Sequence, residues 1–175
     1  YYKFYNENGK ISVEGKMIKK TKTGFWKYYD IDGILEKKIE YKNIRGKEHT
    51  NQGIYYTKEG DTLKHPSNFV LVDYKDEIKI NEIVNIDITY VRALDQDNEI
   101  ELVFSQDFNE DFSNTESVKK TSFNTGLDGF TFKMKYESAG KRIIRGYIKE
   151  SIDNPDNKAE KIIRFVYFEM PFIVN

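Results

Sequence analysis

The sequence predicts an all-β protein in two parts, an array of β-hairpin repeats followed by an antiparallel β-sandwich. Two observations support this prediction. Before residue 64, an aromatic strand, a glycine-containing turn and a returning strand occur three times, and repetition at a period in the twenties is typical of repeat architectures. After residue 69, apolar and polar residues alternate in several short runs, as they do in half-buried strands.

The second copy of the repeat, residues 24–35, has the clearest pattern. In its first strand Trp26 and Tyr28 alternate with Lys27, which is the period-two pattern of a strand. Its turn ends at Gly33, and glycine supplies the positive φ that tight hairpins need.

Two further copies flank it. The first (2–11) begins 24 residues upstream of the matching strand, and the turn glycine of the third (53–63) lies 27 residues beyond Gly33. A single hairpin is marginally stable in water. We therefore expect neighbouring hairpins to stabilise each other by laying their aromatic rings together.

The second copy fits a known consensus, Gly-x-Trp-x-x-Tyr-x-x-x-Gly. The residues at its four fixed positions are Gly24, Trp26, Tyr29 and Gly33. This segment resembles the bacterial variant of the MORN repeat, whose copies are joined by a Gly-Lys step, as at 46–47. The first copy has Tyr2 in place of the tryptophan, and the third has none. The resemblance covers about a third of the chain and implies a hairpin array; proteins with such repeats include antitoxin-like and immunity-like ones.

A boundary follows the repeats. Residues 65–68, His-Pro-Ser-Asn, break the pattern, and such residues between unlike segments mark domain boundaries. We therefore predict a repeat domain at 1–66 and a sandwich at 67–175. The first has 14 basic and 9 acidic residues, a net charge of +5, and the second has 14 and 20, a net charge of −6.

The second part predicts seven strands. These are 69–74, 78–80, 84–90, 100–104, 130–136, 144–149 and 162–170, the last ending before Pro171. Such spacing fits an antiparallel sandwich of immunoglobulin-like type. The Cys-Trp-Cys hallmark is absent, so the likeness is one of architecture. We expect no helix beyond a single turn in 113–120.

Composition argues against an enzyme. The chain has no cysteine, which excludes disulfides, thiolate metal sites and cysteine nucleophiles. Its two histidines, His49 and His65, lie in segments that read as loops. No motif for hydrolysis, zinc binding or phosphate binding occurs. We therefore predict no catalytic residues and no cofactor.

An acidic run raises the question of a metal. Residues 95–116 hold eight acids and no lysine or arginine, with alternate acids at Asp95, Asp97 and Glu99. Calcium binds converging carboxylate and carbonyl oxygens, but the glycine and terminal glutamate of an EF-hand loop are missing. We interpret the run as a solvated acidic loop and predict no metal site.

The candidate binding residues are in the array. They are Trp26, Tyr28, Tyr55 and Lys27. The aromatic residues fit a core between repeats; the alternative is a stacking platform for a sugar ring or a peptide. Lysines alternate with glutamates, so we expect no nucleic-acid partner.

These observations predict a non-catalytic interaction module of a bacterial protein with a protein partner, an acidic one if the basic array is the docking face. One alternative is that the acidic second part folds back onto the array. Another is an antitoxin-like or immunity-like inhibitor that masks a toxin, and a third is a carbohydrate-binding protein.

No apolar run reaches the ~18 residues that span a bilayer. The chain starts at Tyr1 without methionine, so we expect a trimmed or processed chain. Together with the predicted sandwich, this favours a cell-envelope or secreted protein over a cytoplasmic one.

Overall fold

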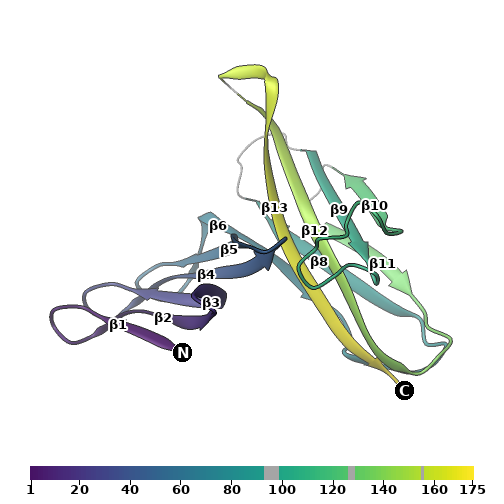
Figure 1. Ribbon diagram of the computed structural model, residues 1–175, viewed down its shortest axis with the longest axis horizontal. Coiled ribbons are helices and arrows are strands. Elements are labelled where there is room, and N and C mark those ends of the chain that lie inside the picture. Colours follow the sequence, from purple (N-terminus) through teal and green to yellow (C-terminus); the bar gives the residue numbers. More distant parts are fainter. Residues whose placement is uncertain (93–98, 126–128, 155) are drawn as a thin grey trace. The chain divides into compact units, whose positions relative to one another are not determined.

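The computed structural model describes residues 1–92, 99–125, 129–154 and 156–175 (Figure 1). Its regular elements are thirteen strands, and no described residue is helical. The predicted all-β class is therefore confirmed. The chain divides into two compact units, Tyr1–Phe69 and Val70–Asn175. The division between residues 69 and 70 lies inside the strand Thr62–Asp73, whereas the sequence analysis predicted a boundary after residue 66.

Unit 1 is an antiparallel meander in which each strand pairs with the next along the chain. Its strands are β1 (Tyr2–Tyr5), β2 (Ile11–Ile18), β3 (Thr21–Tyr29), β4 (Leu35–Ile44), β5 (Lys47–Tyr56) and β6 (Thr62–Asp73). The first part of β6 pairs with β5. Both histidines lie in strands, His49 in β5 and His65 in β6, where the sequence suggested loops.

Three turns at one end of the meander have the same hydrogen bonds. In the turn 6–10 the Asn6 amide donates to the Lys10 carbonyl at 2.8 Å, and the Gly9 amide donates back to the Asn6 carbonyl at 2.9 Å. The same pair of bonds recurs in the turns 30–34 and 57–61. The fourth residue of each turn is a glycine with φ between +79° and +95°, a conformation that glycine adopts without steric cost.

The core of unit 1 is built on Trp26. Its side chain is 1% exposed, and its ring lies over Gly15 of the adjacent strand so closely that a Cβ there would overlap it. The indole N–H donates to the Lys16 carbonyl at 3.1 Å. Ile39 lies opposite Trp26 on β4, and the Phe4 ring stacks at 6.5 Å. One aromatic side chain thus contacts the three strands around it.

Unit 2 has two sheets with a shared apolar core. One sheet is formed by the end of β6, β8 and β11, and the other has the order β10–β9–β12–β13–β7. The strands are β7 (Glu77–Ile78), β8 (Val84–Val91), β9 (Glu99–Ser105), β10 (Thr121–Thr125), β11 (Gly129–Met134), β12 (Gly140–Asn154) and β13 (Asn157–Val174). This is a β-sandwich arrangement; its immunoglobulin-like character stays a prediction.

The core of unit 2 follows the predicted alternation. Ile86, Ile88 and Tyr90 of β8 pack among apolar residues of β9, β12 and β13. Phe132 of β11 stacks on Phe104 of β9 at 4.7 Å. Alternate residues of strands from both sheets therefore meet in one cluster, as expected for packed sheets.

The structure differs from the predicted strands in three places. β10 was not predicted, because it has a single large apolar residue, Phe123, and therefore little periodicity. β13 continues through Pro171 to Val174. The Tyr74 hydroxyl donates to the Pro171 carbonyl at 3.1 Å, so the backbone of Pro171 faces away from β12. On that side of the strand, the missing N–H of proline removes no hydrogen bond between β12 and β13. Residues 113–120 form turns and no helix.

We predict that Trp26→Ala strongly destabilises unit 1. Truncating a buried aromatic residue costs ~3–5 kcal/mol. Phe25 is the matched control because it is adjacent in the chain and 44% exposed; Phe25→Ala should change the unfolding free energy by less than about 1 kcal/mol. Denaturant unfolding followed by amide resonances of unit 1 measures both. Equal losses in the two variants would show that Trp26 is not the core of the array.

Candidate functional site

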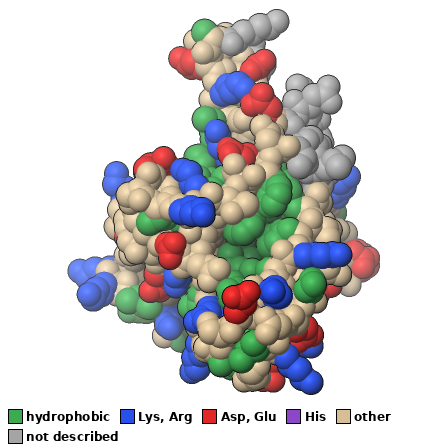
Figure 2. Space-filling view, turned by 90° about the vertical axis from the view of Figure 1, so that its right-hand side faces the viewer, with side chains coloured by type: hydrophobic (Ala, Val, Ile, Leu, Met, Phe, Trp, Pro, Cys, Tyr) green, Lys and Arg blue, Asp and Glu red, His purple; other side chains and the backbone are tan. Residues whose placement is uncertain are grey.

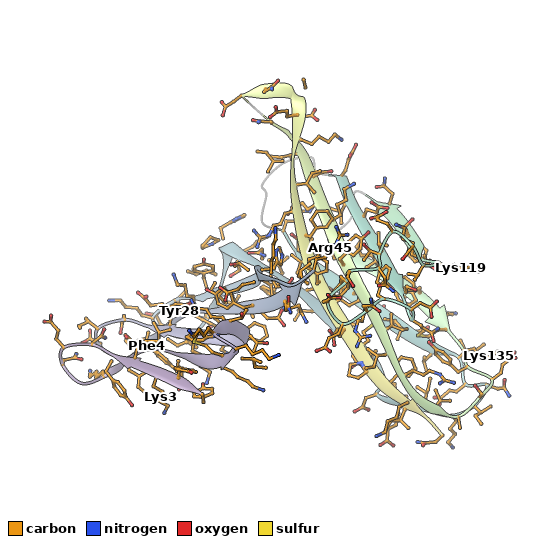
Figure 3. All side chains as sticks on the ribbon, viewed as in Figure 1. Lys3, Phe4, Tyr28, Arg45, Lys119 and Lys135 are labelled. Carbon is orange, nitrogen blue, oxygen red and sulfur yellow. The ribbon has the colours of Figure 1, made fainter. Side chains whose placement is uncertain are left out.

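Strand register places a row of residues on one face of the array. Residues that lie directly opposite each other on paired strands share a face. The row across β1 to β5 is Phe4, Val13, Tyr28, Lys37 and Tyr55. Phe4 and Tyr28 are labelled in Figure 3. Trp26 shares this face, because it is two residues from Tyr28 on the same strand.

Two lysines on this face lie over aromatic rings. The Lys22 Nζ lies 4.9 Å from the centre of the Trp26 ring and 4.7 Å from that of Tyr41. The Lys37 Nζ lies 5.2 Å from the Tyr28 ring centre and 5.8 Å from that of Tyr55. These are cation–π distances. We call this surface the cation–aromatic face; its residues are Lys22, Trp26, Tyr28, Lys37, Tyr41 and Tyr55.

Hydrogen bonds join the two lysine sites. The Tyr28 and Tyr41 hydroxyls are 2.8 Å apart, and the Lys22 Nζ donates to the Tyr28 hydroxyl at 3.4 Å. Burial, followed by the bond to Tyr28, raises the pKa of Tyr41. Within the described part of the chain, the ammonium groups of Lys22 and Lys37 have no carboxylate within ion-pair distance; the Glu48 carboxylate lies beside Lys22 but accepts from its backbone N–H, at 2.7 Å.

The opposite face has a different electrostatic character. Glu14 accepts a hydrogen bond from the Tyr29 hydroxyl at 2.8 Å and lies 3.7 Å from Lys27 and 3.8 Å from Lys3. The hydrogen bond from Tyr29, with smaller contributions from the two lysines, lowers the pKa of Glu14 despite partial burial. Burial first, and then Glu14, raises the pKa of Tyr29 to about 12. Glu14 thus provides a carboxylate for two lysines of this face, whereas a third, Lys38, lies over the Tyr56 ring at 5.4 Å.

The structure therefore separates the four residues that the sequence singled out. Trp26, Tyr28 and Tyr55 lie on the cation–aromatic face, and Lys27 lies on the opposite one. Period two in β3 already implies that Lys27 and its neighbours point to opposite faces. Lys22 and Lys37 are not among those four; the register between β3, β4 and β5 is what brings Lys37 next to two tyrosines.

An open pocket of about 300 Å³ adjoins this face at the end of the array with the three glycine turns. Its lining comes from the turn 30–34, from the ends of β4 and β5, and from the turn 57–61 with the start of β6. The residues that line it are Asp30, Ile34, Leu35, Glu36, Lys37, Tyr55, Tyr56, Thr57, Lys58 and Leu63. Lys37 and Tyr55 belong to both the pocket and the cation–aromatic face.

The described part of the acidic run is anchored in unit 2 by aromatic residues. Phe108 and Phe112 are buried on β12 and β13, with Phe108 stacked on Tyr147 at 6.2 Å and Phe112 4.6 Å from Tyr167. Asp95 and Asp97 lie outside the described residues. Among the residues that are described, no group of three or more histidines, aspartates or glutamates is arranged to hold a metal ion.

Comparisons with protein-family models, with curated proteins and with solved structures found no match to this chain. Across the described ranges no helix is long and apolar enough to cross a membrane. The assignment of a function therefore depends on the geometry of the chain's own residues.

We predict that Glu14→Gln lowers the pKa of Tyr29 from about 12, because the carboxylate that opposes tyrosinate formation is lost, while burial and the smaller effect of Tyr1 remain. In the wild type, the stabilisation from the raised Tyr29 pKa is present below pH 10 and is lost as pH rises toward 12. The stabilisation from the lowered Glu14 pKa is present above pH 4.5 and is lost as the pH falls below this value.

Titration of the Tyr29 ring resonance by NMR measures this pKa in both proteins. Lys3→Gln is the control, because it removes a neighbour of Glu14 that makes no contribution to Tyr29 itself. An unchanged pKa of Tyr29 in Glu14→Gln would mean that the Glu14 carboxylate does not raise it.

Proposed function

We propose that this protein is a non-catalytic interaction module that binds an acidic segment of a protein partner through the cation–aromatic face. The observation that supports this most is the state of Lys22 and Lys37. Each ammonium group lies over two aromatic rings, and in the described residues neither is paired with a carboxylate. Both keep N–H donors for a carboxylate from another molecule.

The aromatic rings contribute to binding in two ways. They hold the lysine side chains in place before binding, which reduces the entropy lost when the complex forms. The partly exposed rings of Tyr28, Tyr41 and Tyr55 also supply flat, partly apolar contact area, and tyrosine is enriched in protein interfaces for this reason. The net charge of +5 on residues 1–66 favours an acidic partner through association rate and specificity.

The opposite face provides an internal comparison. There Glu14 lies within 3.8 Å of both Lys3 and Lys27, so these lysines have a carboxylate at hand. An incoming acidic group would compete with Glu14 for them. Lys3 and Lys27 thus differ from Lys22 and Lys37 in the availability of their cations. The cation–aromatic face has two lysines held over two rings each, whereas on the opposite face Lys38 lies over the Tyr56 ring alone, and this difference favours the cation–aromatic face as the docking surface.

Two other partner classes fit less well. Nucleic-acid binding requires a basic stripe or patch, whereas acidic residues lie among the basic ones in the array, 9 against 14 in residues 1–66, and both kinds are interspersed on the side of the chain that Figure 2 presents. A sugar platform needs an open aromatic ring. The Trp26 ring is buried, and Lys37 lies between the rings of Tyr28 and Tyr55.

We predict that Lys22→Gln combined with Lys37→Gln weakens partner binding about tenfold, which is ~1.4 kcal/mol. The control is Lys3→Gln combined with Lys27→Gln, because it removes the same charge from the opposite face. The wild-type chain is cross-linked to its partner in cells of its source organism, the partner is identified by mass spectrometry, and affinities are then measured with purified proteins.

The wild-type affinity should fall with added salt, and the control should stay within about twofold of it. Equal losses in the two double variants would assign binding to net charge and not to this face. Unchanged affinity in the Lys22/Lys37 variant would refute the proposal.

A further inference from the structure

The first and second glycine turns of the array are joined by side-chain hydrogen bonds. Asn6, Asn8 and Lys10 of the first turn donate to the backbone carbonyls of residues 30–32, at 3.4, 2.7 and 2.7 Å respectively. The Lys10 side chain also lies beside Gly33, where an added Cβ would be in van der Waals contact with it. These contacts close the gap between two hairpin ends that are otherwise held only by their strands.

The second and third turns lack these bonds. The residues of the second turn that are equivalent to the three donors are Asp30, Asp32 and Ile34. A carboxylate or an isoleucine side chain has no N–H to donate. The Asp30 carboxylate accepts from its own turn instead, from the amides of residues 32 and 34 at 2.9 and 2.8 Å. Both turns are fully described, and no hydrogen bond joins them.

The pocket of about 300 Å³ lies at this second junction. Where Lys10 fills the first junction, Ile34 leaves apolar surface in the second. Ile34 and Leu63, on its two sides, are each 38% exposed. Leu35 and the Tyr55 ring add further apolar lining. A change of three residues between two copies of one hairpin thus replaces a hydrogen-bonded contact with an apolar pocket.

The surroundings of the pocket indicate what occupies it. Lys37, which lies over the two tyrosine rings, and Lys58 are both part of the lining, which also includes the acidic residues Asp30 and Glu36. Because the Asp30 carboxylate is held by the amides of its own turn, a carboxylate next to the occupant would meet Lys37 as its cation. Interface pockets that take a bulky side chain supply much of the binding energy of a docked segment. The volume suits one such side chain and lies at the lower end of the range for small-molecule sites.

We propose that this pocket binds a large apolar side chain, such as phenylalanine, that stands next to acidic residues in the partner's segment. This inference rests on the proposed function, because the pocket and the cation–aromatic face share Lys37 and Tyr55. It adds a sequence requirement: acidic residues alone are insufficient, and an apolar anchor beside them carries the specificity.

Two acetylated peptides test the anchor, Glu-Asp-Phe-Glu-Asp and Glu-Asp-Ala-Glu-Asp. Each is titrated at low salt into the whole chain with labelled isoleucine and leucine methyl groups. We expect the phenylalanine peptide to bind at least tenfold more tightly than the alanine peptide. It should shift the methyl resonances of Ile34, Leu35 and Leu63, whereas those of Ile31, which is exposed but does not line the pocket, should stay unchanged.

A turn graft tests the location. The triple variant Asp30→Asn, Asp32→Asn, Ile34→Lys copies the donors of the first turn and should close the pocket, so the two peptides should bind it equally. The graft adds positive charge, which by itself favours both acidic peptides; loss of the preference for phenylalanine therefore cannot result from charge. If the graft fails to fold, the methyl shifts in the wild type decide.

The remaining outcomes separate this inference from the proposed function. If both peptides bind the wild type equally and Lys22→Gln with Lys37→Gln weakens both, the face docks acidic segments and the anchor pocket is refuted. If the graft keeps the preference for phenylalanine, the anchor lies elsewhere. If neither peptide shifts any resonance of the array, both proposals are refuted.

Discussion

The array depends on the contact between the Trp26 ring and the backbone of Gly15. A side chain at that position would occupy the place of the ring, so the pair works only as an aromatic residue facing a glycine across two strands. Unit 2 uses the same device: a Cβ at Gly146 of β12 would overlap the Phe168 ring of β13. In both units a glycine, which is unfavourable in a strand by itself, is covered by a large ring, and the ring gains a buried position close to the backbone.

This contact also fixes which side chains form the surface beside it. With Trp26 buried, strand alternation directs Tyr28 to the same face and Lys27 to the opposite one. The register of β3, β4 and β5 then brings Lys37 between Tyr28 and Tyr55. The lysines above the rings, Lys22 and Lys37, and the lysines around Glu14, Lys3 and Lys27, differ in the carboxylates available to their ammonium groups. The proposed docking face follows from the core of the array.

The sequence was sufficient for the features that depend on local pattern. The three glycine turns, the all-β class and the alternation in β8 follow from residue type and period. The sequence was insufficient where the cause is a contact between distant strands. The pairing of Lys37 with two tyrosines requires the register, and the anchoring of the acidic run by Phe108 and Phe112 requires the outer surface of β12 and β13. The continuation of β13 through Pro171 depends on the unpaired edge at that point.

The central claim is that Lys22 and Lys37 are held over aromatic rings in the free protein. The ε-methylene proton shifts of assigned lysines measure this directly, because protons above a ring are shielded. The account predicts upfield shifts for Lys22 and Lys37, which lie within 5.8 Å of two ring centres each, and none for Lys27. Shifts for Lys22 and Lys37 equal to those of a solvated lysine would contradict it, because the docking face would then not exist before the partner binds.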